Sequence, residues 1–368
     1  MKKVSIYIIA MILSILLIPT LIISFGKSIY FDDPGNLNKT GDSNTTDKLI
    51  NISGTNPRTP LPVTHDKSGD YVISVYNAQT ENVFQIPLEE YIVSVVIAEM
   101  PASFEIEAIK AQAVAARTYT YKRLISGNYD EKHKGAAICT DSSHCQAWTA
   151  LEKVIDSTPD ANGNNAIKAA AKIEKVRKAV TETAGLIACY NEEPIEALYH
   201  SCSGGMTEYA EKVWDGKGYP YLKPVKSSGE EIAANKYKTA VNVSPDDFLK
   251  KLEKAKSDFS SGANDLKNKG IDDIFQSIKN ITRSDSGRVL TLKIGGVEFT
   301  GRDMRKIFGL NSTNITFSVK DNKIVLTTLG YGHGVGLSQY GANARAKEGM
   351  KFKEILKFYY TGIDIKKI

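Results

Sequence analysis

The sequence lacks most of the patterns that would assign it quickly to a common class of protein. It has only 4 cysteines in 368 residues, and a chain of this length does not need a disulfide framework. No internal repeat is present, so a repeat architecture is not indicated. The formal net charge of +5 is spread along the chain without an arginine-rich stripe, so nucleic acid is not an expected partner.

Two catalytic or cofactor motifs are also incomplete. The glycine run Gly330-Tyr331-Gly332-His333-Gly334-Val335-Gly336 does not fit G-x-G-x-x-G, because Leu337 follows it. A dinucleotide site is therefore not supported. Ser203 lacks the flanking glycines of G-x-S-x-G, so the sequence does not indicate a nucleophile elbow.

The amino-terminal segment carries the clearest physical signal. An uncharged, mainly apolar run from Val4 to Phe25 follows two lysines, and about 20 such residues can span a bilayer. The run ends without an A-x-A-like site, so we expect a single-pass signal-anchor over residues 1–27, with a cleavable signal peptide as the alternative. The lysines favour an extracytoplasmic location for the rest of the chain. Residues 28–68 are poor in large apolar side chains and are predicted to be a flexible linker.

Residues 69–368 are predicted to form one extracytoplasmic domain. The patterns predict strands over 71–76, 83–86, 186–190, 195–199, 289–294 and 323–328, and helices over 87–99, 105–124 and 166–183. Strands and helices are mixed without regular βαβ alternation, which indicates the α+β class. The Lys-, Ser- and Asp-rich stretch Ser227–Asn280 is predicted to be a peripheral helical insertion, and two short helices close the chain.

Glu99 is a candidate proton donor. It ends a predicted helix that begins near Pro87 and must stop near Pro101, and the stretch Tyr91 to Ala98 before it carries no charge. Partial desolvation and the negative end of the helix dipole both disfavour the carboxylate and raise the pKa of Glu99. Such a group can donate a proton near neutral pH. The alternative is a glutamate at a helix end that points into water.

No second acid lies in a comparable sequence setting, whereas glycoside cleavage usually needs two carboxylates. One exception is a substrate whose own hydroxyl attacks the anomeric carbon. Muramic acid has such a hydroxyl, and its attack gives a 1,6-anhydro ring. A lone Glu99 is therefore compatible with a lytic transglycosylase and unfavourable for an ordinary hydrolase.

A short loop holds two imidazoles and two thiols, from His133, Cys139, His144 and Cys145. These residue types match the ligands of a tetrahedral zinc site, although the spacing is not that of a standard finger. The alternative is a Cys139–Cys145 disulfide with two surface histidines. If all four residues bind zinc, no position stays open for water, and the metal is structural.

Two further stretches are rich in polar residues and glycine. In Tyr199-His200-Ser201-Cys202-Ser203-Gly204-Gly205, a polar turn that lines a cleft is favoured over a Ser or Cys nucleophile. A hairpin centred on 191–194 would place Cys189 near Glu196, away from Cys202.

In the glycine run, glycine at every second position would let a flat ligand lie against the backbone. Ser338 can cap the helix that follows, which Gly349 would end.

Four motifs, in order, resemble the stage II sporulation protein D family of lytic transglycosylases. They are Ala98-Glu99-Met100-Pro101, the stretch from Glu107 to Tyr119 (EAIKAQAVAARTY), Tyr199 to Gly205 (YHSCSGG), and Gly332 to Ala342 (GHGVGLSQYGA). The resemblance covers about residue 71 to the carboxyl terminus and is weakest over Ser227–Asn280. Cys202 stands where a Ser or Thr is more usual in the family.

The resemblance implies cleavage of septal peptidoglycan glycan strands during sporulation engulfment, at the cell membrane. The strands would first be stripped of peptides by an amidase, stage II sporulation protein P, and the membrane protein stage II sporulation protein M would complete the assembly. Glu99 falls on the family's catalytic acid, and the His/Cys cluster is similar to the zinc site of some members. We expect the other polar motif residues to line the glycan-binding cleft: Arg117, His200, Ser201, Ser203, His333 and Gln339.

Two alternatives to a glycan-cleaving enzyme remain open. Related domains occur in amidase enhancers, which would hold glycan without cutting it, and Glu99 in its apolar setting is the feature that argues against this role. A zinc hydrolase would need an open metal position, which four available ligands argue against.

Overall fold

A computed structural model describes the protein over residues 50–52, 64–67, 69–127, 130–156, 164–214, 216 and 218–368. The predicted anchor, residues 1–27, lies outside these residues, as does most of the predicted linker. Among the helices that are described, none combines the length and the apolar character needed to cross a membrane. The described residues form helices and mainly antiparallel sheets, which confirms the α+β class.

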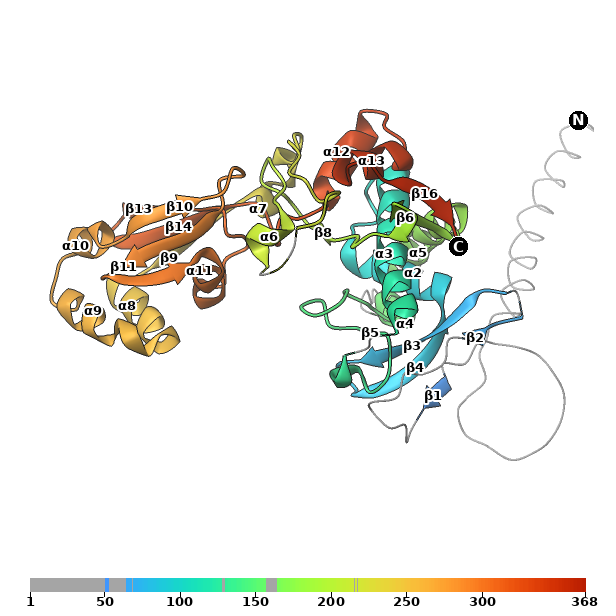
Figure 1. Cartoon of the computed structure of the whole chain (residues 1–368), viewed down its shortest axis with the longest axis horizontal. Helices are drawn as coiled ribbons and strands as arrows, with labels where there is room; N and C mark the ends of the chain where they lie inside the picture. The colour runs from blue at the N-terminus through green and yellow to red at the C-terminus, as the bar shows by residue number, and fades with distance from the viewer. Residues whose placement is uncertain are drawn as a thin grey trace, which may run out of the picture. The chain divides into compact units, whose positions relative to one another are not determined.

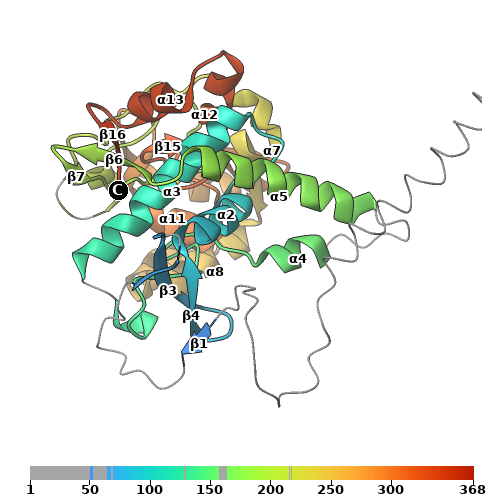
Figure 2. The ribbon, with the colours of Figure 1, turned by 90° about the vertical axis from the view of Figure 1, so that its right-hand side faces the viewer.

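A five-stranded sheet begins the folded part (Figure 2). Its order is β1-β4-β3-β2 with β5 parallel to β3, and the strands are β1 (Ile50–Ile52), β2 (Thr64–His65), β3 (Tyr71–Asn77), β4 (Asn82–Pro87) and β5 (Ile138–Cys139). β3 and β4 are the two strands predicted there. β1 and β2 lie within the predicted linker, residues 28–68, and pair with β4 and β3. Backbone pairing to an existing sheet orders them without the large apolar side chains that this stretch lacks.

Helices pack around α3 to form the first core (Figure 2). They are α2 (Leu88–Glu99), α3 (Ile106–Ser126), α4 (Leu151–Asp156), α5 (Asn164–Glu182), α12 (Gln339–Lys347) and α13 (Phe352–Tyr359). α3 contacts α2, α5, α12 and α13, and its alanines between Ala108 and Ala116 are completely buried. A helix with apolar or small residues on all sides is expected to be buried, and alanine lets its neighbours approach closely. Ser338 caps α12 as predicted, accepting from the Gly341 N–H at 3.3 Å.

The predicted hairpin is tighter than expected. The strands of this region are β6 (Leu186–Tyr190), β7 (Glu193–Pro194) and β16 (Asp364–Lys367) in one sheet, and β8 (Tyr199–His200) with β15 (Leu337–Ser338) in another. Asn191 and Glu192 form the turn with positive φ values of 48° and 69°, so Cys189 pairs with Pro194 and not with Glu196. The predicted second strand, 195–199, is wrong as a hairpin partner: β8 instead pairs in parallel with β15.

The predicted peripheral helical insertion is part of a second core, which extends to residue 326 (Figure 1). Its elements are β9 (Lys238–Val243), α8 (Pro245–Ala255), α9 (Ser260–Leu266), α10 (Ile271–Gln276), β10 (Lys279–Arg283), β11 (Val289–Ile294), β12 (Val297–Thr300), α11 (Gly301–Phe308), β13 (Ile315–Lys320) and β14 (Lys323–Leu329). α8 buries Phe248, Leu249 and Leu252 against this core. The insertion prediction missed that these spaced apolar residues need a sheet to cover them.

Short elements complete the chain. They are α6 (Ala210–Val213), α7 (Ala234–Tyr237) and the 3₁₀ turns η2 (Glu131–His133), η3 (Glu231–Ala233) and η4 (Ser257–Phe259). Residues 199–237 and 330–338 connect the two cores, and four of the six predicted cleft residues lie in these connections: His200, Ser201, Ser203 and His333.

Candidate functional site

Glu99 is the last residue of α2, whose preceding turns are buried in the first core. Its half-buried carboxyl accepts two hydrogen bonds, from the Ala147 backbone N–H to Oε1 at 2.8 Å and from the Gln339 amide to Oε2 at 3.3 Å. Burial raises the pKa of Glu99, and these hydrogen bonds offset only part of that effect. The structure therefore confirms that Glu99 is partly desolvated and that its pKa is raised.

Glu99 lines a cavity of 810 Å³. Its walls also include the loop 142–147 that follows β5, residues 198–201 around β8, residues 331–333 of the glycine run, and Gln339 at the start of α12. Among the described residues that line this cavity, Glu99 is the only carboxylate. An arrangement with one acid cannot supply the carboxylate pair of an ordinary glycosidase.

The cavity brings together four of the six polar residues that the sequence suggested for a cleft. His200, Ser201, His333 and Gln339 all line it beside Glu99. The parallel pairing of β8 with β15 assembles this group, because it sets residues 199–200 beside residues 337–338. Motifs more than a hundred positions apart in the sequence therefore share one wall.

Arg117 does not line the cavity, so the expectation for this residue is corrected. Its side chain is completely buried within the first core. The guanidinium forms a bidentate pair with Glu89, with Nε to Oε1 at 2.8 Å and Nη2 to Oε2 at 2.5 Å. Its Nη1 also donates to the Leu186 carbonyl at 3.1 Å. Arg117 thus ties α3 to α2 and β6, which explains a long cation in an alanine-rich helix.

Ser203 also lies away from the cavity, because it serves a buried carboxylate. The Ser203 hydroxyl donates to Oε1 of Glu230 at 2.9 Å, and its backbone N–H donates to Oε2 at 2.7 Å. The Cys202 thiol donates to the same Oε2 at 3.0 Å, and Ser227 donates to Oε1 at 2.5 Å. The nucleophile reading of this turn therefore finds no support: both side chains hold Glu230, which is 0% exposed.

His200 and His333 present opposite hydrogen-bonding groups. Nδ1 of His200 donates to the Val335 carbonyl at 3.1 Å, so the neutral ring keeps Nε2 as an acceptor, and this atom has no partner among the described residues. The Val335 N–H donates to Nδ1 of His333 at 3.0 Å, which leaves Nε2–H of His333 as a donor. Burial lowers the pKa of His200 well below its usual value and that of His333 to about 3, so both stay neutral near pH 7.

The glycine run approaches its own chain closely, and residues 331–333 of it also line the cavity. A Cβ on Gly336 would lie 2.0 Å from the Leu198 carbonyl oxygen, and one on Gly332 would lie 2.9 Å from the His200 Cβ. Both glycines also have positive φ values, of 74° and 109°. Glycine is thus required there so that the run can pack against the segment around β8.

The predicted metal ligands form one cluster. The ligand atoms of His133, Cys139, His144 and Cys145 all lie within 4.8 Å of one another. Nε2 of His133 lies 3.1 Å from Nδ1 of His144, and Sγ of Cys145 lies 3.4 Å from that Nδ1 and 3.7 Å from Nε2 of His133. Tetrahedral bonds of about 2.05 Å to nitrogen and 2.3 Å to sulfur would separate such atoms by roughly 3.3–3.8 Å. The four side chains therefore fit a single tetrahedral zinc ion.

The two neighbouring thiols favour one thiolate, which suits a metal: the pKa of Cys139 is lowered, while the hydrogen bond with Cys139 raises the pKa of Cys145. Cys139 and Cys145 are free thiols in the structure, which does not contain the alternative disulfide. The hydrogen bond from Cys145 and the neighbouring His133 lower the pKa of Cys139, which favours the thiolate that binds metals. Oδ2 of Asp130 accepts from Nε2 of His144 at 3.1 Å and so orients Nδ1 toward the cluster.

The cluster is linked to Glu99 through the residues that follow Cys145. Gln146 is 1% exposed, and its amide oxygen accepts from the Tyr199 hydroxyl at 2.8 Å. Ala147 then places its backbone N–H on the Glu99 carboxyl. The conformation of the His/Cys loop thus determines where one of the two donors to Glu99 lies.

Sequence reasoning missed several residues of the cavity wall: Trp214, Lys236, Arg302, Arg305 and Tyr331. The rings of Trp214 and Tyr331 are 39% and 37% exposed, although large aromatic rings are usually buried. Trp214 is one of only 2 tryptophans in the chain, which is a signal the sequence does contain. The arginines lie on α11 of the second core, and nothing in their local sequence indicates that they reach the cavity.

Comparisons with known proteins agree on one family. A family model described as Stage II sporulation protein matches residues 76–190. The chain is 38% identical to "Stage II sporulation protein D" of Bacillus subtilis (strain 168) over 300 residues, which cover 81% of this chain and 80% of the relative. It is 34% identical to the protein of that name from Bacillus amyloliquefaciens, over 81% of this chain and 80% of the relative. An "Amidase enhancer" of Bacillus subtilis (strain 168) is 30% identical, over 72% of this chain and 38% of the relative.

Proposed function

This chain belongs to the stage II sporulation protein D family, and we propose that it is a lytic transglycosylase that cleaves peptidoglycan glycan strands with Glu99 as general acid and base. One observation carries the proposal: Glu99 is the only carboxylate among the described lining residues of a large cavity, and burial raises its pKa. A glycosidase that uses water needs a second carboxylate, whereas attack by a hydroxyl of the substrate needs only one acid that then acts as a base.

The reaction conserves every proton and uses no water. Protonated Glu99 donates its proton to the glycosidic oxygen while the bond between that oxygen and C1 of muramic acid breaks. The C6 hydroxyl of the same muramic acid forms a new bond to C1, and the Glu99 carboxylate accepts the hydroxyl proton. One product has a new free hydroxyl, the other ends in 1,6-anhydromuramic acid, and Glu99 is again protonated.

The neighbouring side chains have roles that follow from their hydrogen bonds. Gln339 and the Ala147 N–H hold the Glu99 carboxyl in place. Nε2–H of His333 can donate to a sugar oxygen, whereas Nε2 of His200 is buried from solvent behind the cavity wall. Ser201 adds a hydroxyl to the same wall, and the exposed rings of Trp214 and Tyr331 offer flat apolar surfaces for sugar rings.

We also propose that His133, Cys139, His144 and Cys145 bind one structural zinc ion. The supporting observations are the mutual distances of the four ligand atoms and the lowered pKa of Cys139. When bound, zinc would neutralise the thiolates and fix the loop, and four protein ligands would leave it no position for water. The loop would then hold the Ala147 N–H against Glu99, so the metal would support the site from the cavity wall, which His144 and Cys145 help to form.

The names of the two Bacillus relatives support a role in sporulation, and we propose that this role is septal wall remodelling during engulfment. We propose that residues 1–27 anchor the chain to the cell membrane, with the catalytic domain outside the cytoplasm at the sporulation septum. By family resemblance, stage II sporulation protein P would supply strands without peptides, and stage II sporulation protein M would complete the membrane assembly.

A second candidate function follows from the relative named amidase enhancer. In that case the cavity would hold glycan without cutting it, and only a partner amidase would act. The two functions separate when full-length protein alone is incubated with peptide-free glycan strands. A transglycosylase shortens the strands without a partner, whereas an enhancer leaves them intact and only increases the peptide release that a purified amidase produces.

A further inference from the structure

The cavity around Glu99 has a strong excess of positive charge. Arg123, Lys236, Arg302 and Arg305 line it, against the single carboxylate of Glu99. Arg123 has an acidic partner, since its Nη1 lies 3.5 Å from Glu196. In the part of the chain that the structure describes, neither α11 arginine forms an ion pair: Arg302 donates to the Val213 carbonyl at 3.1 Å, and Arg305 to the Leu310 carbonyl at 3.2 Å. The two guanidinium groups therefore keep unused donors beside the cavity.

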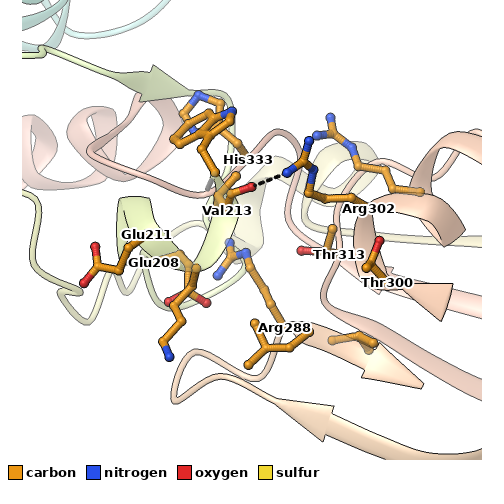
Figure 3. A pocket seen from close by; sticks show the side chains of 13 residues that line it. Glu208, Glu211, Val213, Arg288, Thr300, Arg302, Thr313 and His333 are labelled. Atoms are coloured by element: carbon orange, nitrogen blue, oxygen red, sulfur yellow. Dashed lines mark hydrogen bonds between the residues drawn. The ribbon is translucent and has the colours of Figure 1, made fainter. Parts of the chain in front are cut away.

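The arginines lie where the cavity meets a smaller pocket. This pocket has a volume of 240 Å³ and shares Val213, Trp214, Arg302, Arg305 and His333 with the main cavity. Figure 3 shows Arg302 reaching the Val213 carbonyl near His333, with Arg288 beside them.

Arg288 adds a further positive charge to the smaller pocket. It is only 2% exposed, and its Nε has no partner among the described residues. The pocket is also lined by Lys212 and by two carboxylates, Glu208 and Glu211, so its four cations outnumber its two acids. Ser284 and Ser286 donate to Glu208. A buried donor without a partner, next to two unpaired guanidinium groups, indicates that the pocket is built for an anion.

The chemistry of the glycan strand provides one kind of anion. Its amino sugars are N-acetylated and neutral, and each muramic acid carries a lactyl ether that ends in a carboxyl group. In peptide-bearing strands that carboxyl is an amide bond to the stem peptide and has no charge. Removal of the peptide leaves a free carboxylate, which matches the planar, bidentate geometry that guanidinium groups recognise.

We propose that Arg302 and Arg305 form a subsite for the free lactyl carboxylate of muramic acid, and that they select strands without peptides. This inference rests on the proposed function, because it explains how the same cavity recognises its substrate. Both arginines act as specificity residues and take no part in the proton transfers at Glu99. The second core, which carries α11, thereby contributes to substrate choice while the first core contributes the acid.

The test compares two strands of equal size. Peptide-free glycan strands are used as they are, or after their lactyl carboxyls have been converted to primary carboxamides, which removes the charge and little else. kcat/KM is measured on both strands for the full-length protein, the Arg302→Gln/Arg305→Gln variant and a control, Lys306→Gln, which changes an exposed cation of α11 outside the cavity. The wild type should favour the carboxylate strand by about tenfold to a hundredfold. The double variant should bring the ratio close to one, and the control should keep the wild-type ratio.

Three results would overturn the inference. The wild type could have equal kcat/KM on both strands, or the double variant could lose the same factor of kcat/KM on both strands. The Lys306→Gln control could also change the ratio between the strands as much as the double variant does. The single variant Arg302→Gln is used if the double variant does not fold, because it leaves the hydrogen bond from Arg305 to Leu310 intact. It should lower the preference for the carboxylate strand, but less than the double variant does. Binding of both strands to Glu99→Gln protein separates the two proposals. If the wild type cuts neither strand, the proposed function fails, while preferential binding of the carboxylate strand would still support the subsite.

Discussion

Among the glutamates that the described structure withdraws from water, Glu230 and Glu99 have surroundings that differ in two respects. Glu230 sits under the turn that follows β8 and accepts five hydrogen bonds, from Ser203 twice, Cys202, Gly204 and Ser227. Glu99, at the end of α2, accepts two. Glu230 is fully enclosed, whereas Glu99 lines the large cavity.

In the proposed function, this difference separates a structural carboxylate from the catalytic one. A buried carboxylate with many donors is stabilised in its charged form and fixes the chain around it. A partly buried carboxylate with few donors is poorly stabilised in its charged form, so its pKa rises and it becomes a better proton donor. Burial alone would suggest a proton donor at both residues. Only the number of hydrogen-bond donors and access to the cavity distinguish them.

The largest effect is expected for Glu99→Gln. Glutamine keeps the shape of the side chain but cannot donate a proton of comparable acidity, so strand cleavage should fall by about 10²–10⁴-fold. Glycan binding and folding should be nearly unchanged. The measurement is the rate at which full-length protein shortens peptide-free strands. Glu105→Gln, an exposed glutamate outside the cavity, is the matched control and should keep wild-type activity. Substantial activity in Glu99→Gln would contradict the assignment.

The converse change, Glu230→Gln, should act on stability. Glutamine replaces an acceptor oxygen with an N–H₂ group, which would face hydrogen-bond donors inside a closed site. We expect a loss of about 2–4 kcal/mol in the free energy of unfolding, measured by urea denaturation. Cys202→Ser is the control, because a hydroxyl can still donate to Glu230, and its loss should stay below about 1 kcal/mol. A Glu230→Gln variant of wild-type stability with no activity would reverse the roles assigned to the two glutamates.

A smaller effect is expected when the Ala147 donor to Glu99 is loosened. Cys145→Ser removes one ligand of the His/Cys cluster and should reduce bound zinc, which elemental analysis of the purified protein measures. Because the loop then holds the Ala147 N–H less firmly, activity should fall by about tenfold. Cys189→Ser changes a buried thiol outside the cluster and is the control. Fully active protein without metal and with a Cys139–Cys145 disulfide would contradict the zinc proposal.

The smallest effect concerns the pH dependence of stability. In the unfolded chain Glu99 titrates near its ordinary pKa of 4.5, and in the folded protein its pKa is raised. Between these two values the folded state binds more protons, so this group lowers stability as pH rises. Glu99→Gln removes that contribution. Denaturant unfolding should show a slight gain in stability for the variant at pH 7 and no gain below about pH 4. A variant less stable than the wild type only at pH 7 would mean that the charged form of Glu99 is stabilised by folding.

Features set by neighbouring residues in the sequence could be predicted. The apolar stretch before Glu99 and the proline after it were sufficient to predict where α2 ends and that the pKa of Glu99 is raised. The two histidines and two cysteines of the cluster lie within one short loop, so their proximity could also be predicted. The same holds for α3 and β11, whose residues follow regular patterns.

Features set by distant partners could not be predicted. Arg117 looked like a ligand for glycan because its partner, Glu89, lies 28 positions away on another helix. Ser203 looked like a cleft residue because its partner, Glu230, lies in the stretch Ser227–Asn280, which was predicted to be peripheral. The arginines of α11 reach the cavity only because the second core carries them there. In each case the partner of a charged or polar group decides its role, and local sequence does not reveal the partner.

The end group of the product tests the central claim most directly. Wild-type full-length protein is incubated with peptide-free glycan strands in water enriched in heavy oxygen, and the new ends are identified by mass spectrometry. With Glu99 as the only acid and the C6 hydroxyl as the nucleophile, the new ends should be 1,6-anhydromuramic acid and should contain no heavy oxygen. Reducing muramic acid ends that carry heavy oxygen would show that water attacks, and would require a second catalytic carboxylate that the described cavity does not contain.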